Sequence, residues 1–262
     1  KNDIIVVRGN TYENRANLSS DFIRDIAEQY EGTTLGRQEI YADLILSADG
    51  ALWSLGLIDM ARIRDGMLPS LGRIVIAVDP QTGYHVGDED PSRRLKSVAR
   101  STLTGIVAVG ASVPVRGRPL HAYVLEDGSL NGKPEQWGMR AIQMYRYYSQ
   151  QYPTTLLAEA NQGGQMIRSI ITSLDPNVPI KLVTAKVKKH ERAIPVVSKY
   201  QQGRVHHVGV LPMLESELIT YEPGDEDTKR SPNRLDACVW GIRYLLVDGT
   251  RAGAGYAIKR II

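Results

Sequence analysis

Short apolar runs alternate along the chain with longer segments in which apolar residues recur every three or four positions. The clearest run spans residues 73–80 and ends in Asp79 and a proline, a pattern that predicts a strand buried on both faces. Residues 104–113 and 119–125 predict two further strands. Because only a tight turn around Gly117 separates them, we expect these two strands to form a hairpin.

The second half of the chain alternates predicted helices with short predicted strands. The predicted helices lie at 134–151, directly after Gly163-Gly164, and at 191–201, 211–220 and 235–247, and the predicted strands lie at 155–159, 180–184 and 204–208. An antiparallel meander of three strands followed by parallel strand–helix units predicts an α/β fold. Its sheet is expected to be mixed, with helices on both faces.

Three parts are expected along the chain. Residues 1–70 predict a linker or arm, in which Trp53 is expected to bury its side chain either on this domain or against a partner. Residues 71–248 predict the main domain. Residues 249–262, which are rich in Gly, Ala and Arg, predict a flexible C-terminal tail.

Composition narrows the function only slightly. Apolar residues make up 42% and charged residues 23% of the 262, a globular composition that argues against disorder. No apolar run approaches the roughly 20 residues of a membrane span, so no membrane partner is expected. The single cysteine, Cys238, excludes an internal disulfide and an all-cysteine zinc site. The net charge of +3 is too small to indicate nucleic-acid binding by itself. The first residue is not Met, which suggests a fragment or a processed product.

Three carboxylates stand where a metal site could form. Asp79 and Glu159 each end a predicted strand, and Asp236 lies near the start of the last predicted helix. Ligands bind at the carboxyl ends of strands in an open α/β sheet, and close carboxylates favour Mg²⁺ or Mn²⁺. Two such ions would activate a water and stabilise the leaving oxygen in phosphodiester cleavage. Alternatively, Asp79 only ends a strand, Asp236 only caps a helix, and Glu159 is a solvated acid.

Several segments together resemble a known family. They are IVIAVDP at Ile74–Pro80, LAEANQGG at Leu157–Gly164 and SPNRLDACVW at Ser231–Trp240, supported by GNTYENRANL at Gly9–Leu18 and QGRVHHVG at Gln202–Gly209. In this order and spacing they resemble the C-terminal nuclease half of the large terminase subunit of tailed bacteriophages, over nearly the whole chain. The resemblance implies a ribonuclease H-like fold and metal-dependent cutting of concatemeric double-stranded viral DNA during genome packaging.

The same resemblance implies roles for individual residues. It makes Asp79, Glu159 and Asp236 the catalytic and metal-binding acids, which hold two ions of Mg²⁺ or Mn²⁺ and cut with little sequence specificity. Many relatives have an acid where this chain has Asn233, so a fourth carboxylate is not supplied at that position.

The resemblance also implies partners. In the family, a segment like residues 1–70 follows the ATPase motor, and this motor is expected to be absent here. The chain lacks a G-x-x-x-x-G-K-[ST] loop, so we expect no ATP hydrolysis by it. The implied partners are double-stranded DNA, the ATPase domain, the small terminase subunit and the portal protein. The implied place of action is the host cell cytoplasm.

Two basic clusters are candidates for binding DNA. Lys186, Lys188, Lys189 and Arg192 follow the predicted strand at 180–184, where they could hold phosphates without reading sequence. The alternative is an ordinary solvated loop. Two further candidates, Arg116 and Arg118, flank Gly117 in the predicted hairpin, which could equally be a plain soluble turn.

Three functions therefore remain open from the sequence. The favoured one is a two-metal endonuclease that cuts double-stranded DNA. A second is another ribonuclease H-like nuclease, such as a junction resolvase, which would prefer branched substrates. A third is a non-catalytic docking module of the packaging motor, which would not bind Mn²⁺.

Overall fold

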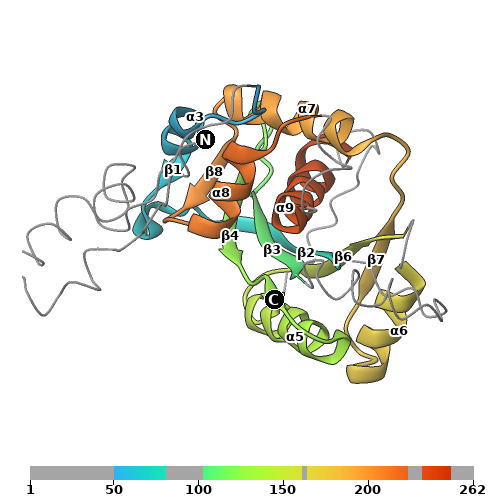
Figure 1. The fold of residues 1–262 in the computed structure, drawn as a ribbon. Coiled ribbons are helices and arrows are strands. Elements are labelled where there is room, and N and C mark those ends of the chain that lie inside the picture. Colours follow the sequence, from blue (N-terminus) through green and yellow to red (C-terminus); the bar gives the residue numbers. More distant parts are fainter. Residues whose placement is uncertain (1–49, 81–102, 161–163, 224–231, 249–262) are drawn as a thin grey trace, which may run out of the picture.

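The computed structural model describes residues 50–80, 103–160, 164–223 and 232–248 (Figure 1). The predictions for most of the arm and for the tail at 249–262 lie outside these residues. The described strands form one eight-stranded sheet. They are β1 (Arg62–Ile63), β2 (Leu71–Asp79), β3 (Leu103–Ser112), β4 (Ala122–Asp127), β5 (Leu130–Asn131), β6 (Thr154–Glu159), β7 (Ile180–Val183) and β8 (Val205–Val208).

The sheet is mixed, with the order β1-β8-β4-β3-β2-β6-β7, and β5 pairs with β3. β2, β3 and β4 form the antiparallel meander, and β6 and β7 continue the sheet in parallel from β2. This arrangement confirms the predicted ribonuclease H-like mixed sheet. On the other side of β4, β8 and then β1 extend the sheet in parallel.

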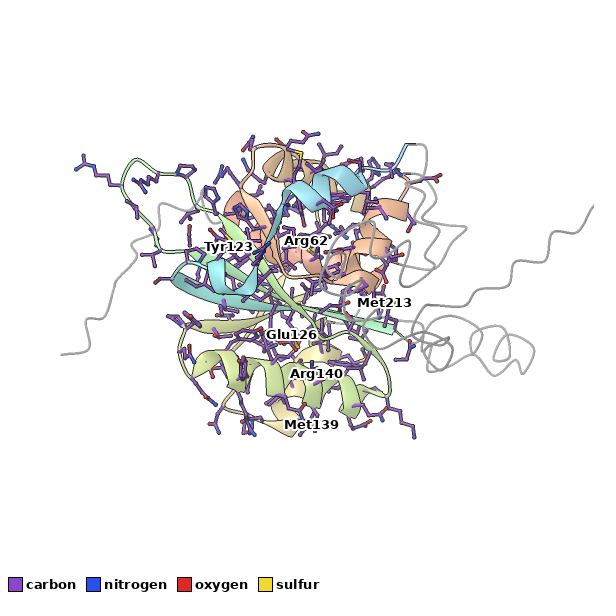
Figure 2. All side chains as sticks on the ribbon, turned by 90° about the vertical axis from the view of Figure 1, so that its left-hand side faces the viewer. Arg62, Tyr123, Glu126, Met139, Arg140 and Met213 are labelled. Atoms are coloured by element: carbon purple, nitrogen blue, oxygen red, sulfur yellow. The ribbon has the colours of Figure 1, made fainter. Side chains whose placement is uncertain are left out.

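Helices cover both faces of the sheet (Figure 1). One face carries α5 (Pro134–Ser149) and α6 (Gly164–Leu174), and the other carries α3 (Leu55–Met60), α7 (Lys189–Gln201), α8 (Pro212–Thr220) and α9 (Asn233–Arg243). A 3-10 turn at Asp65–Met67 precedes β2, and a π-helical turn at Tyr244–Asp248 follows α9. In Figure 2, Arg62 lies above the sheet, on the face of α3 and α8, and Glu126 and Arg140 lie below it, on the face of α5. Among these helices, none is both long and apolar enough to cross a membrane.

The alternation of side chains along β2 divides them between two apolar cores. Ile76 and Val78 belong to the core under α5 and α6, whereas Val75 and Ala77 belong to the core under α7, α8 and α9. Successive side chains of a strand point to opposite faces of the sheet. The next residue, Asp79, therefore lies on the α9 face at the carboxyl end of β2.

The end of the predicted arm docks on the main domain. Trp53 and Ile58 are fully buried in the core of the α9 face, so of the two alternatives left open by the sequence, Trp53 packs on this domain. The Trp53 ring meets the Tyr200 ring edge-on, with centroids 6.1 Å apart. Beyond α3, β1 pairs with β8 and becomes an edge of the sheet. A two-residue strand has no periodicity to detect, so the sequence did not predict β1.

Gly105 of β3 allows α9 to approach the sheet closely, and we expect its replacement to be destabilising. A Cβ at Gly105 would overlap the backbone carbonyl of Asn233, at the start of α9. Gly105→Ala should therefore cost about 1–3 kcal/mol in the free energy of unfolding, as overpacking does. The matched control is Gly56→Ala in α3, because a Cβ there meets nothing within 4 Å. The control should stabilise the helix by roughly 0.5–1 kcal/mol. Urea denaturation measures both changes, and equal stabilities of the two variants would contradict the close packing.

Candidate active site

Two neighbouring parallel strands bring Asp79 and Glu159 to the same edge of the sheet. β2 and β6 pair in parallel register up to Val78 opposite Ala158, so Asp79 and Glu159 are the next residues of the two strands. Alternate residues of both strands belong to the core of the α9 face, which places both carboxylates on that face. The sequence prediction that each of these acids ends a strand is confirmed. That the two strands are neighbours is a finding of the structure.

α9 carries Asp236 on its first turn, and α8 and β3 fix the start of this helix. The backbone N–H of Arg234 donates to Oε2 of Glu217 at 2.9 Å, which pairs a donor that the first turn of a helix leaves unsatisfied. Nδ2 of the buried Asn233 donates to the Leu103 carbonyl at 2.5 Å. Asn233, at the position where the resemblance expects an acid, therefore anchors α9 to β3.

The three carboxylates form one electrostatic cluster. Burial raises the pKa of Asp79 well above its usual range, and the negative charges of Asp236 and Glu159 add to this effect against the charges of Lys189 and Arg192. Burial also raises the pKa of Asp236, again opposed by Lys189 and Arg192. Asp79 feels the charges of Asp236 and Glu159, and Asp236 feels that of Glu159. The structure therefore places the three residues that the sequence singled out near one another, with the Arg192 guanidinium between Glu159 and Asp236.

Two basic side chains of α7 face this cluster. The Lys189 ammonium pairs with Oδ2 of Asp236. The buried Arg192 guanidinium lies 3.4 Å from Oδ1 of Asp236 and 3.6 Å from Oε2 of Glu159. These separations are longer than ordinary charge-assisted hydrogen bonds. Within the described residues, Nε of Arg192 has no hydrogen-bond acceptor. Arg192 therefore compensates the acids through its charge more than through tight hydrogen bonds.

Trp240 donates a hydrogen bond to Glu159. Its indole Nε1 donates to Oε2 of Glu159 at 2.9 Å. The Arg192 guanidinium lies over the Trp240 ring, 4.8 Å from its centroid, so ring and cation approach Glu159 together. Trp240 follows Asp236 by four residues and so lies on the same side of α9. The sequence showed this spacing, but nothing in it indicated that Glu159 would be the acceptor.

The chemistry of the cluster fits a divalent cation. All three acids offer oxygen ligands, which suit Mg²⁺ or Mn²⁺, and their negative charge is only partly compensated by α7. Across the described ranges, no three Asp, Glu, His or Cys side chains converge as a ligand set. A cation bound to Oδ2 of Asp236 would have to replace the Lys189 ammonium there.

The predicted DNA-binding residues fall into three groups. Lys186 and Lys188 are exposed in the segment between β7 and α7, at the sheet edge that carries Glu159. Lys189 and Arg192 instead face the carboxylates. Arg116 and Arg118 are exposed, but their connection joins the far ends of β3 and β4.

The pairing of β2 with β3 shows how far the hairpin of Arg116 and Arg118 lies from the acids. Asp79 lies opposite Gly105, whereas Leu71 lies opposite Ser112, just before the hairpin connection. The eight steps of β2 between these two positions span about 26 Å at roughly 3.3 Å a residue. The structure therefore does not bring Arg116 and Arg118 to the acid cluster.

A buried chain of polar side chains lies on the same face of the sheet, and the sequence did not indicate it. Arg62 of β1 binds Oε1 of Glu215 at 2.8 Å, and Nδ1 of His207 lies 3.1 Å from the same oxygen. On the other side of the imidazole, Nε2 lies 2.8 Å from the Tyr200 hydroxyl, which hydrogen-bonds the Cys238 thiol. The chain joins β1 to α9, two residues beyond Asp236. Its members lie far apart in sequence, so no spacing could have revealed it.

Comparison with known proteins bears on the fold. No protein-family model matches the sequence, and no curated protein matches it. The structure is similar to that of the large terminase of a thermophilic bacteriophage in complex with ADP, with a TM-score of 0.54 and 10% identity. The alignment covers 90% of this chain and 55% of the terminase, so this chain spans about half the length of that protein.

Two further structures are isolated nuclease domains. The nuclease domain of the P22 large terminase aligns with a TM-score of 0.46 and 11% identity, over 72% of this chain and 88% of that domain. The human cytomegalovirus terminase nuclease domain, Mn soaked and inhibitor bound, aligns with a TM-score of 0.41 and 11% identity, over 72% and 91%. The likeness to the thermophilic phage protein shows that this chain shares the fold of about half of a large terminase, as the resemblance of its motifs predicts.

Proposed function

We propose that this chain is a divalent-metal-dependent endonuclease that cuts double-stranded viral DNA during genome packaging. One observation carries the proposal: Asp79, Glu159 and Asp236, from two strands and a helix, share one electrostatic cluster at the carboxyl edge of the sheet. The likeness of the fold to a large terminase supports it.

The three carboxylates would hold the metal, two ions in the complete site. When bound, a divalent cation supplies Lewis-acid activation of water and neutralises charge that develops at the phosphate. The chain supplies the scaffold: parallel pairing of β2 and β6 aligns two acids, and the anchored start of α9 presents the third. Lys189 and Arg192 compensate part of the negative charge.

DNA would approach the exposed side of this cluster. The Glu159 side chain retains 20% of its accessible surface, so this carboxylate is within reach of solvent, whereas Asp236 is buried behind it. The exposed Lys186 and Lys188 lie at the same edge and would contact phosphates without reading bases. Arg116 and Arg118 would contact the duplex only if it extended along the sheet to the far end of β3. We therefore assign the two lysines the larger share of binding.

The proposal extends to the organisation of the longer machine. Residues 71–248 would be the nuclease domain, with residues 1–70 as the connection to an ATPase motor and residues 249–262 as a tail. The motor, the small terminase subunit and the portal protein would be partners, and cutting would occur in the host cell cytoplasm. This chain would cut DNA without hydrolysing ATP itself.

A plasmid-nicking assay tests the proposal. The purified chain is incubated with supercoiled plasmid in Mn²⁺, in Mg²⁺ and in EDTA, and in parallel with a linear duplex and a four-way junction of the same sequence. We expect nicking and linearisation with a divalent metal, none in EDTA, and no preference for the junction.

Two other results of this assay would each indicate a different function. A strong preference for the four-way junction would replace the packaging nuclease with a resolvase. Absence of cleavage in both metals, by a chain that circular dichroism shows to be folded and that also fails to bind Mn²⁺, would contradict a nuclease and favour a docking module. A folded chain that binds Mn²⁺ without cutting would indicate a nuclease that needs its motor.

A further inference from the structure

The two oxygens of the Glu159 carboxylate differ in their surroundings. Oε2 accepts the hydrogen bond from Nε1 of Trp240 at 2.9 Å, and it is also the oxygen that the Arg192 guanidinium approaches at 3.6 Å. Within the described part of the chain, no hydrogen bond or ion pair to Oε1 is found. Among the described residues, the protein therefore holds Glu159 through Oε2 alone.

The donor that holds Oε2 is well fixed. The Trp240 side chain is 5% exposed and packs in the apolar core of the α9 face. An indole N–H can only donate, and it does not change its protonation state with pH. A phenyl ring could fill the same apolar space. A buried indole, by contrast, usually donates its N–H to a hydrogen-bond acceptor, and here that acceptor is the Glu159 carboxylate.

The position of Trp240 also links two of the acids. One helical turn separates Trp240 from Asp236, so α9 presents one carboxylate itself and holds another through the indole. The Arg192 guanidinium over the ring, 4.8 Å from its centroid, adds a cation–π contact that restrains the indole from the α7 side.

We propose that Trp240 is a positioning residue for Glu159: by holding Oε2 it fixes the one orientation in which the carboxylate would bind a cation. The inference rests on the proposed function, because it presumes that Glu159 is a metal ligand. Without the indole N–H, Glu159 would sample several rotamers, and ordering it would reduce metal affinity. Loss of a group that orients a ligand typically weakens metal binding by 10–100-fold.

Calorimetric titration of the whole chain with Mn²⁺ measures this effect. We expect Trp240→Phe to raise the Kd for Mn²⁺ by about tenfold or more. The matched control is Trp137→Phe, which makes the same chemical change in the buried core under α5, on the opposite face of the sheet. The control should leave the Kd unchanged. An unchanged Kd in Trp240→Phe would overturn the positioning role.

A second variant removes the N–H while keeping the ring. Site-specific replacement of Trp240 by 3-benzothienylalanine, in which sulfur takes the place of N–H, preserves the shape of the side chain if the Phe variant is unstable. It should raise the Kd for Mn²⁺ as Phe does, whereas a wild-type Kd would show that only packing matters.

Luminescence of Tb³⁺, excited through tryptophan, tests separately whether the ion lies beside Trp240, because the indole is the sensitiser. Wild type and Trp137→Phe should sensitise the ion, and Trp240→Phe should lose most of the emission. Equal emission from all three would place the ion elsewhere. If wild type binds no Mn²⁺, the proposed function fails as well, but if wild type binds and cleaves while Trp240→Phe has the same Kd, only the positioning role fails.

Discussion

Asp79→Asn is expected to abolish metal-dependent cleavage while making the metal-free fold more stable. Asp79 ends β2 beside Glu159, and burial together with the charges of Asp236 and Glu159 raises its pKa well above the usual range. The amide removes a metal ligand, and we expect cleavage to fall at least about 10³-fold, since metal catalysis contributes several kcal/mol to the transition state. The amide also removes the least favourable charge of the cluster, so the free energy of unfolding without metal should rise.

The two readouts together separate catalysis from folding. Plasmid nicking in Mn²⁺ measures cleavage, and thermal unfolding in EDTA measures stability. The matched control is Asp175→Asn, because Asp175 follows α6 and pairs with Arg146 at 2.8 Å, away from the cluster. It should leave nicking unchanged. Wild-type nicking by Asp79→Asn would contradict the assignment, and a destabilised metal-free variant would show that the acids do not repel one another as argued.

Glu215→Gln is expected to destabilise the protein by about 3–5 kcal/mol, the usual cost of removing one partner from a buried ion pair. The Glu215 side chain is fully buried, and it binds Arg62 at 2.8 Å and His207 at 3.1 Å. The amide leaves the Arg62 guanidinium without its main charge partner. Since Arg62 belongs to β1, the docked end of the arm should loosen first. Urea denaturation gives the free energy, and hydrogen exchange of the β1 and β8 amides gives the location.

The control for this variant is Glu126→Gln. Glu126 pairs with Arg140 at 2.7 Å, but the two side chains keep 32% and 38% of their accessible surface. A pair that is this exposed contributes about 0–1 kcal/mol. If Glu215→Gln cost no more than Glu126→Gln, the buried chain would not be what fixes the arm to the domain.

The contribution of Glu215 to the free energy of unfolding should decrease as the pH falls. Although burial opposes it, hydrogen bonds and charge from His207 and Arg62 lower the pKa of Glu215 from 4.5 to about 2. A carboxylate whose pKa is lower in the folded state than in the unfolded state stabilises the folded protein. That contribution is complete at pH values above the unfolded-state pKa, and it is lost as the pH falls through the folded-state pKa. The difference in stability between wild type and Glu215→Gln should therefore hold above pH 4.5 and shrink by about 3 kcal/mol toward pH 2. A difference that stayed constant over this interval would contradict the ion pair.

Local pattern was sufficient for the framework of the site. The apolar runs that end in Asp79 and Glu159 could be recognised as strands because buried strands carry a continuous apolar signal. Their parallel pairing is a finding of the structure. Asp236 lies on the first turn of α9, as the helical spacing from 235 onward predicted. Both signals depend only on residues that are close in sequence. The order of the predicted strands and helices then indicated a mixed sheet.

Contacts between distant segments could not be predicted in the same way. Lys189 and Arg192, three residues apart, share one face of α7, yet only the packing of α7 beside α9 turns that face toward the acids. The sequence suggested phosphate ligands there, and the structure shows partners of carboxylates. The pairing of His207 with Glu215 is likewise set by tertiary packing.

Anomalous scattering from a crystal soaked in Mn²⁺ tests most directly whether the three carboxylates hold a catalytic cation. We predict a manganese peak within ligand distance of Asp79 and Glu159, roughly 2.0–2.6 Å for such oxygen ligands. We also predict that the Lys189 ammonium leaves Oδ2 of Asp236 when a second ion binds. A soaked crystal with ordered side chains, no peak at these acids and Lys189 still paired with Asp236 would contradict the metal centre, and with it the proposed nuclease.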